Sequence, residues 1–178
     1  MNDYFPRWRI EPGAGRDLRI GIIGAGGIVS GAHLPAYRDA GLNVVAITDL
    51  DADKAGSVAA DFDIPVVAAT AEELAARGDV DVVDVAVLPW VQPQIVDIVA
   101  AAGKHMLCQK PLAMDYGTGL TMVDVAERAG VVLAVNHQMR WDAGIAASRD
   151  LIEQGVIGTV TAVSYTHLRA HETVTVSA

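Results

Sequence analysis

The sequence predicts a doubly wound α/β fold, in which helices cover both faces of a parallel sheet. Short β-branched segments alternate with helical segments through short connections from Leu18 to Asn136. Several of the strand segments are apolar on both faces, as buried parallel strands are. A glycine cluster directly after the first apolar segment is the third observation, because such a turn often opens a ligand-binding α/β sheet.

The elements are expected in a regular order after an irregular arm over residues 1–17, where prolines and glycines break any periodicity. Strands are predicted at 18–24, 43–49, 65–67, 80–88, 105–109 and 131–136. Helices are predicted at about 27–40, 51–62, 71–77, 91–103 and 116–130. Asp51 is the expected N-cap of the second helix, and Gly103 suits the end of the fourth.

Size and composition limit the classes of function. The chain has 178 residues, enough for one domain and the start of a second, and 52% of them are hydrophobic. A formal charge of −9 argues against a nucleic-acid or anionic-membrane partner. Cys108 is the single cysteine, so no internal disulfide forms and a reducing compartment fits. No signal-peptide segment opens the chain and no apolar run reaches the ~20 residues of a membrane span, so we expect a cytoplasmic protein.

The glycine cluster has the spacing of a dinucleotide-binding turn. Gly24 and Gly26 fit its first two glycines, one for the tight turn and one for close approach of a pyrophosphate. The amides of Gly26, Gly27 and Ile28 would then face the phosphates at the positive end of a helix. Val29 occupies the third glycine position, which implies slightly wider packing of helix on strand. A plain tight turn is the alternative interpretation.

Asp49 ends the second predicted strand, 25 residues after Gly24. A carboxylate there would accept hydrogen bonds from the adenosine ribose and repel a 2′-phosphate, which favours NAD over NADP as the cofactor. The alternative makes Asp49 a helix cap shared with Asp51. Pro89 and Trp90 end the fourth predicted strand, where they would line the nicotinamide side of the crevice. The alternative is that Pro89 only terminates the strand.

These features, together with Gln109-Lys110-Pro111 after the fifth strand, resemble the Gfo/Idh/MocA oxidoreductases, nicotinamide-dependent dehydrogenases that act mostly on sugars, inositols and related polyols. The resemblance runs from about Leu18 to Thr161, and the Gln-Lys-Pro string matches the family's Glu-Lys-Pro motif. His33 stands where the family usually carries a histidine in its first helix. The segments "VNHQMRWD" and "LIEQGVIGTV" resemble the family's passage into a second domain.

The resemblance implies that Lys110 is catalytic. It would hydrogen-bond the reacting hydroxyl beside the cofactor and assist proton transfer as hydride leaves, while the following proline restricts its backbone to extended values. The sequence leaves open whether the Lys110–Pro111 bond is cis. Gln109 departs from the family's glutamate and lacks its negative charge.

Further candidates lie near the motif and after the sixth strand. Three residues after the sixth strand are substrate-side candidates, and Arg140 alternatively braces the domain junction; they are Asn136, His137 and Arg140. Cys108 is expected to be a buried thiol and not a nucleophile. No metal site is expected.

We expect an NAD-binding domain at 18–140, the start of a truncated substrate domain at 141–162, and a non-native tail at 163–178. The string "VSYTHLRAHET" resembles one reading frame of a sequencing adapter, so His167 and His171 are not read as metal ligands. The predicted function is that of an NAD-dependent dehydrogenase of a sugar, inositol or polyol, inactive in this truncated form and homo-oligomeric in its full-length parent. A non-catalytic NAD-binding or interaction module is the alternative.

Overall fold

The computed structural model describes residues 17–166 and 173–177, with side chains as far as residue 162. The expected arm therefore lies outside the described residues except for Asp17, and so do His167 and His171. The chain divides into two compact units, the larger ending at His137 and the smaller continuing from Gln138.

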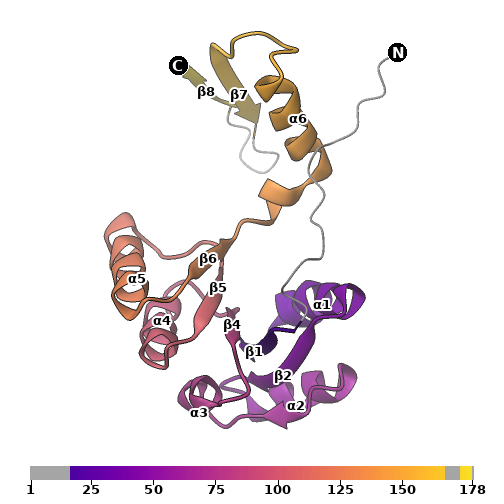
Figure 1. Ribbon diagram of the computed structural model, residues 1–178, viewed down its shortest axis with the longest axis vertical. Coiled ribbons are helices and arrows are strands. Elements are labelled where there is room, and N and C mark those ends of the chain that lie inside the picture. The colour runs from indigo at the N-terminus through magenta and orange to yellow at the C-terminus, as the bar shows by residue number, and fades with distance from the viewer. Residues whose placement is uncertain (1–16, 167–172, 178) are drawn as a thin grey trace. The chain divides into compact units, whose positions relative to one another are not determined.

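The larger unit is built on six parallel strands in the order β3-β2-β1-β4-β5-β6 (Figure 1). The strands are β1 (Arg19–Ile23), β2 (Asn43–Thr48), β3 (Val66–Val67), β4 (Val82–Val85), β5 (His105–Gln109) and β6 (Leu133–Asn136). This is the doubly wound order of a Rossmann fold, so the fold prediction is confirmed. The order changes direction between β1 and β4, and the crevice at their carboxyl ends is where such sheets bind ligands.

Helical segments connect the strands. They are η1 (Val29–His33), α1 (Leu34–Ala40), α2 (Ala52–Asp61), α3 (Ala71–Ala76), α4 (Gln92–Ala101) and α5 (Tyr116–Ala129). The Asp51 side chain accepts from the Lys54 amide and caps α2, as predicted. Gly103 takes a φ of 69° just after α4, the left-handed conformation that ends many helices. The first helix differs from its prediction, because η1 is wound as a wider π-helix before α1 begins.

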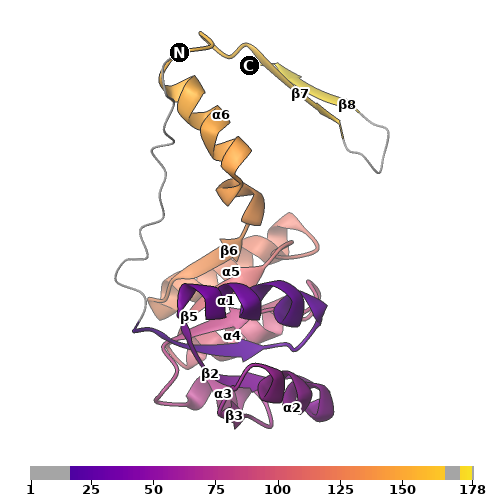
Figure 2. The same cartoon turned by 90° about the vertical axis from the view of Figure 1, so that its right-hand side faces the viewer.

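Two buried clusters lie on opposite faces of the sheet. One joins Ile22 and Ile47 to Leu34 of α1 and Val58 of α2. The other joins the strands to the buried faces of α3, α4 and α5, through residues such as Leu74, Val99 and Met122. In Figure 2, α1 passes in front of the sheet while α4 and α5 lie behind it. Helices on both faces explain why several of the strands carry apolar residues on both sides.

Strand β4 is shorter than predicted. The apolar run over 80–88 forms a strand only at Val82–Val85, and Pro89 and Trp90 lie in the turn before α4 instead of ending the strand. The reason is that β1 offers no further backbone hydrogen-bond partners to β4 after Ile23. Ala86 N donates to Ile23 O, but the chain then turns at Gly24, whose own amide donates to Thr48 O of β2.

The smaller unit contains η2 (Gln138–Trp141), α6 (Ala143–Glu153), β7 (Ala162–Thr166) and β8 (Thr173–Ser177). Asp142 caps α6 by accepting from the amides of Gly144 and Ile145. Strands β7 and β8 pair antiparallel.

Candidate functional site

The turn after β1 requires glycine at position 24. Gly24 has a φ of 108°, and a Cβ there would lie 2.5 Å from the carbonyl oxygen of Ala86. A side chain would therefore meet both an unfavourable backbone conformation and the main chain of the neighbouring connection. Gly24 lets the chain leave β1 and enter the first helix in a tight turn.

Gly26 and Gly27 border open space, since a Cβ added at either position would meet nothing within 4 Å. The helix begins here, with Val29 N and Ser30 N donating to Gly26 O. The first amides of a helix have no acceptor within it, so those of Gly26, Gly27 and Ile28 are available to a ligand. This arrangement fits a pyrophosphate, because the start of a helix attracts anions and neither Gly26 nor Gly27 has a side chain to keep a phosphate away from the main chain.

Asp49 lies directly beside this turn. Its Oδ2 accepts from Ala25 N at 2.6 Å, and its Oδ1 accepts from Asp51 N at 3.0 Å. Asp51, and not Asp49, caps α2. An ionised carboxylate has about four acceptor positions, so Asp49 can still accept from two ribose hydroxyls. The two backbone bonds fix the carboxylate between the first two parallel strands.

Lys110 follows β5, and its side chain is exposed. Its backbone amide donates to Oε1 of Gln109 at 2.7 Å, and the Lys110–Pro111 peptide bond is cis. Beyond it, Nε2 of Gln92 donates to the carbonyls of Pro111 at 2.8 Å and Leu112 at 3.1 Å. Gln92 is buried at the start of α4, so the main chain is held on both sides of Lys110.

A buried polar network lies behind Gln109. His33 Nδ1 is 2.6 Å from Oδ2 of Asp84, and the Tyr37 hydroxyl donates to that same oxygen at 2.9 Å. On its other side, His33 Nε2 is 3.1 Å from Nε2 of Gln109 and 3.2 Å from Nδ2 of Asn136. His33 and Asp84 are 7% and 2% exposed. Burial, with the charge and hydrogen bond of Asp84, raises the pKa of Tyr37 well above its ordinary value.

Three residues that the structure places around the site were not predicted from the sequence: Asp84, Tyr37 and Gln92. One signal for Asp84 was available, because it is one of only two charged residues, with Asp81, in the run "VDVVDVAVL" and is flanked by valine on both sides. Tyr37 follows His33 by four residues and so shares its helix face. Gln92 carried no signal beyond its place at a helix start.

The other predicted residues lie in different surroundings. Asn136 joins Gln109 at His33, whereas His137 is exposed after β6 and Arg140 belongs to the smaller unit. Trp90 is exposed in the turn before α4. Cys108 is fully buried, and burial together with the Asp84 charge raises the pKa of its thiol to about 12, so the buried-thiol prediction is confirmed. Within the part of the chain that the structure describes, no three His, Cys, Asp or Glu side chains are grouped to hold a metal ion.

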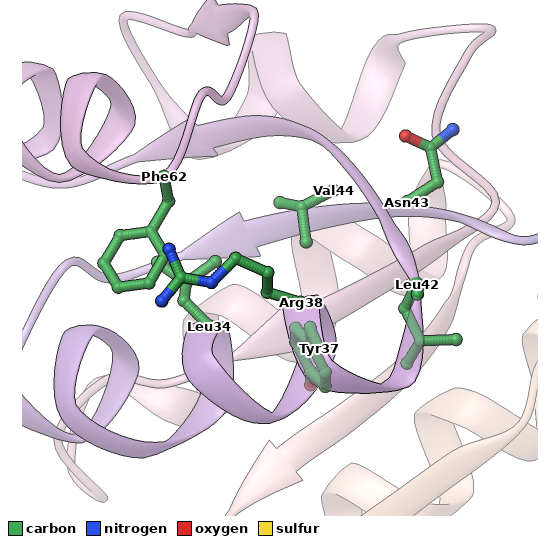
Figure 3. Close-up of a pocket in the computed structure, with 8 residues that line it drawn as sticks. Leu34, Tyr37, Arg38, Leu42, Asn43, Val44 and Phe62 are labelled. Carbon is green, nitrogen blue, oxygen red and sulfur yellow. The ribbon is translucent and has the colours of Figure 1, made fainter.

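A cavity of about 390 Å³ lies elsewhere on the larger unit (Figure 3). It is lined by Leu34, Tyr37 and Arg38 of α1 and by the chain at the start of β2, and Arg38 stacks over the ring of Phe62 at 5.1 Å. Asn43 begins β2 and Asp49 follows its other end. None of the predicted site residues lines this cavity.

None of the helices that the structure describes is long and apolar enough to cross a membrane.

Comparison with known proteins agrees with this geometry. Residues 18–137 match the model of the Gfo/Idh/MocA oxidoreductase family, NAD-binding Rossmann fold. The chain is 36% identical over 149 residues to 1,5-anhydro-D-fructose reductase from Ensifer adhaerens, covering 84% of this chain and 45% of that protein. It is 33% identical over 147 residues to inositol 2-dehydrogenase 3 from Saccharopolyspora erythraea, covering 80% and 42%.

A solved oxidoreductase from Agrobacterium radiobacter, in complex with NAD⁺, L-tartaric acid and magnesium, superimposes with a TM-score of 0.76 at 30% identity. The match covers 80% of this chain and 42% of that one. The chain thus spans less than half the length of these relatives. The chain belongs to the Gfo/Idh/MocA oxidoreductase family and carries its NAD-binding Rossmann fold.

Proposed function

We propose that this chain is the cofactor-binding portion of an NAD-dependent dehydrogenase or reductase that acts on a sugar, an inositol or a related polyol. The observation that carries the proposal is the juxtaposition of the glycine turn and Asp49, which are joined by the bond from Ala25 N. The same sheet presents Lys110 at the carboxyl end of β5. The open crevice of a doubly wound sheet runs along these strand ends.

The glycine turn binds the cofactor's diphosphate through the amides of Gly26, Gly27 and Ile28. Asp49 accepts hydrogen bonds from the adenosine ribose. Asp49 would meet a 2′-phosphate with like charge, and Asp51 and Asp53, which follow it in the sequence, add negative charge to this region. This supports NAD over NADP. Gln109 and Pro89 contribute to the nicotinamide side of the crevice.

Lys110 supplies the proton chemistry. NAD, when bound, supplies hydride transfer at its nicotinamide ring. In the oxidation direction the neutral Lys110 amine takes the proton of the substrate hydroxyl as hydride leaves the carbon for NAD⁺. In the reduction direction the Lys110 ammonium donates a proton to the carbonyl oxygen as hydride arrives from NADH. Asn136, His137 and Arg140 are the substrate-side candidates, with residues 141–162 opening the substrate domain. The names of the reductase and inositol dehydrogenase relatives support a polyhydroxylated substrate. The full-length parent is a homo-oligomer in this proposal.

Titration of the 178-residue chain with NADH tests the cofactor site. We expect saturable binding, and an Asp49→Asn variant that binds NADH about tenfold more weakly, since hydrogen bonds to a charged group contribute about 1.5–3 kcal/mol. The preference for NADH over NADPH should narrow in this variant. Asp97→Asn, on the exposed face of α4, is the matched control. Absence of saturable binding by the folded chain would overturn the proposal.

The catalytic role needs a longer gene product that contains this chain, assayed with a panel of sugars and polyols. We expect Lys110→Met to lower kcat at least about 100-fold, the usual contribution of a general acid or base, with little change in NADH affinity. Arg128→Met removes an exposed charge from α5 and is the control. A non-catalytic NAD-binding module, the second candidate, would bind NADH and turn over no member of the panel.

A further inference from the structure

We infer that His33 is a positioning residue for Lys110: a neutral imidazole that carries its proton on Nδ1 and uses the lone pair of Nε2 to hold Gln109, whose side chain in turn holds the Lys110 amide. The inference rests on the proposed function in one respect, the catalytic role of Lys110. Five elements meet in this network: η1, α1, β4, β5 and β6.

The orientation of the Gln109 amide is fixed by its own neighbour. Its Oε1 accepts from Lys110 N at 2.7 Å, so this end of the amide is the oxygen. Its Nε2 must then face His33, at 3.1 Å from the ring nitrogen. An amide NH₂ group donates and cannot accept. Nε2 of His33 is therefore unprotonated in this arrangement.

Asn136 approaches the same nitrogen from β6, with its Nδ2 at 3.2 Å. The two amide groups come from neighbouring strands, because Gln109 and Asn136 are register partners in the β5–β6 pairing. One imidazole nitrogen thus joins the carboxyl ends of the two strands.

Asp84 fixes the other side of the ring. With Nε2 serving as acceptor, the imidazole proton is on Nδ1 and donates to Oδ2 of Asp84 at 2.6 Å. The Tyr37 hydroxyl donates to the same oxygen, which holds the carboxylate in place. Both His33 and Asp84 are buried, so solvent does not compete for these bonds. In hydrogen-bonded triads of this kind the carboxylate sets the tautomer and orientation of the ring.

The consequence for Lys110 follows from a series of hydrogen bonds that runs from Asp84 to its backbone amide. Asp84 orients His33, His33 orients Gln109, and Gln109 holds the backbone of the next residue. A glutamate at position 109 would present two acceptor oxygens to a ring nitrogen that has no proton. His33 would then have to take a proton on Nε2, or the bond between residue 109 and the ring would be lost.

The tautomer can be measured on the ¹⁵N-labelled 178-residue chain by long-range ¹H–¹⁵N correlation of the imidazole nitrogens. We expect His33 to show a protonated Nδ1 and an unprotonated Nε2. Gln109→Glu should protonate Nε2, whereas Gln94→Glu, the same change at an exposed site on α4, should leave the pattern as it is. A protonated Nε2 in the unsubstituted chain overturns the inference, and that measurement needs no variant to fold.

Amide hydrogen exchange tests the effect on the lysine backbone. Gln109→Met keeps a side chain of similar length but removes both the oxygen that accepts from Lys110 N and the NH₂ group that faces His33. We expect the Lys110 amide to exchange at least about tenfold faster than in the Gln94→Met control. Equal exchange in the two folded variants overturns the positioning role. NADH titration of the same samples separates the two proposals. If the chain binds NADH but His33 does not show a protonated Nδ1 with an unprotonated Nε2, only this inference is refuted. If His33 shows that tautomer but the chain does not bind NADH, only the proposed function is refuted.

Discussion

The two halves of the sheet form their candidate sites, at the carboxyl ends of the strands, from different groups. Between β1 and β2 the site is made by the main chain, with one glycine conformation, a row of amides and a carboxylate bonded to backbone groups. Between β4 and β6 it is made by buried and half-buried side chains that converge on His33. Binding an invariant diphosphate needs only peptide groups, whereas holding a reactive lysine in position needs side chains of defined protonation.

The largest expected effect falls on the side-chain half. Asp84→Ala leaves Nδ1 of His33 and the Tyr37 hydroxyl buried without their acceptor, which should lower the free energy of unfolding by about 3–5 kcal/mol. Urea unfolding measures it, with the exposed Asp97→Ala as control, expected within about 0.5 kcal/mol of the unsubstituted chain. A loss below about 1 kcal/mol would contradict the buried network.

The corresponding change in the main-chain half is Gly24→Ala. The positive φ and the contact with Ala86 O should together cost about 3 kcal/mol and weaken NADH binding at least tenfold. Gly31→Ala, where a Cβ meets nothing within 4 Å, is the matched control and should be neutral or slightly stabilising. Equal stability of the two variants would show that the turn does not need glycine.

Gln92→Met sharpens the comparison, because it removes the hold on the chain beyond Lys110 and leaves the His33 network in place. Two carbonyls lose a donor while the buried, unpartnered Oε1 is removed as well, so we expect a net loss of about 1–2 kcal/mol. Amides following Lys110 should exchange faster than in Gln94→Met. Unchanged exchange there would mean that the loop is held by other contacts.

Tyr37→Phe should have the smallest effect, about 1 kcal/mol at neutral pH for one hydrogen bond. The pKa of Tyr37 is raised in the folded state, so the folded chain keeps a proton that the unfolded chain releases above the ordinary value of 10.0. The stability from this group is present below that pH and falls as pH rises beyond it. The free energies of unfolding of the unsubstituted chain and of Tyr37→Phe, measured from pH 8 to 11, should therefore converge. The free energy of unfolding of Tyr116→Phe, a change at an 81% exposed site, should follow the pH dependence of the unsubstituted chain.

The same contrast separates what the sequence predicts from what it does not. The glycine turn and Asp49 are spaced along a strand–helix–strand unit, so local pattern and one strand pairing suffice to bring them together. Asp84 is 51 residues from His33, and Asn136 is 103 residues away. Their contacts depend on the strand order and on which face of the helix is buried, and no local sequence motif indicates either of these. The short β4 was also missed, because its length is set by where β1 turns away.

The position of Cys108 has a practical consequence. Its sulfur is enclosed in β5, between the layers of helices, and is the only thiol in the chain. A disulfide reagent can therefore react with it only when the sheet opens, so the rate of labelling reports those openings without any introduced probe. The folded protein, in turn, can carry a fluorophore on an engineered surface cysteine while its native thiol stays intact.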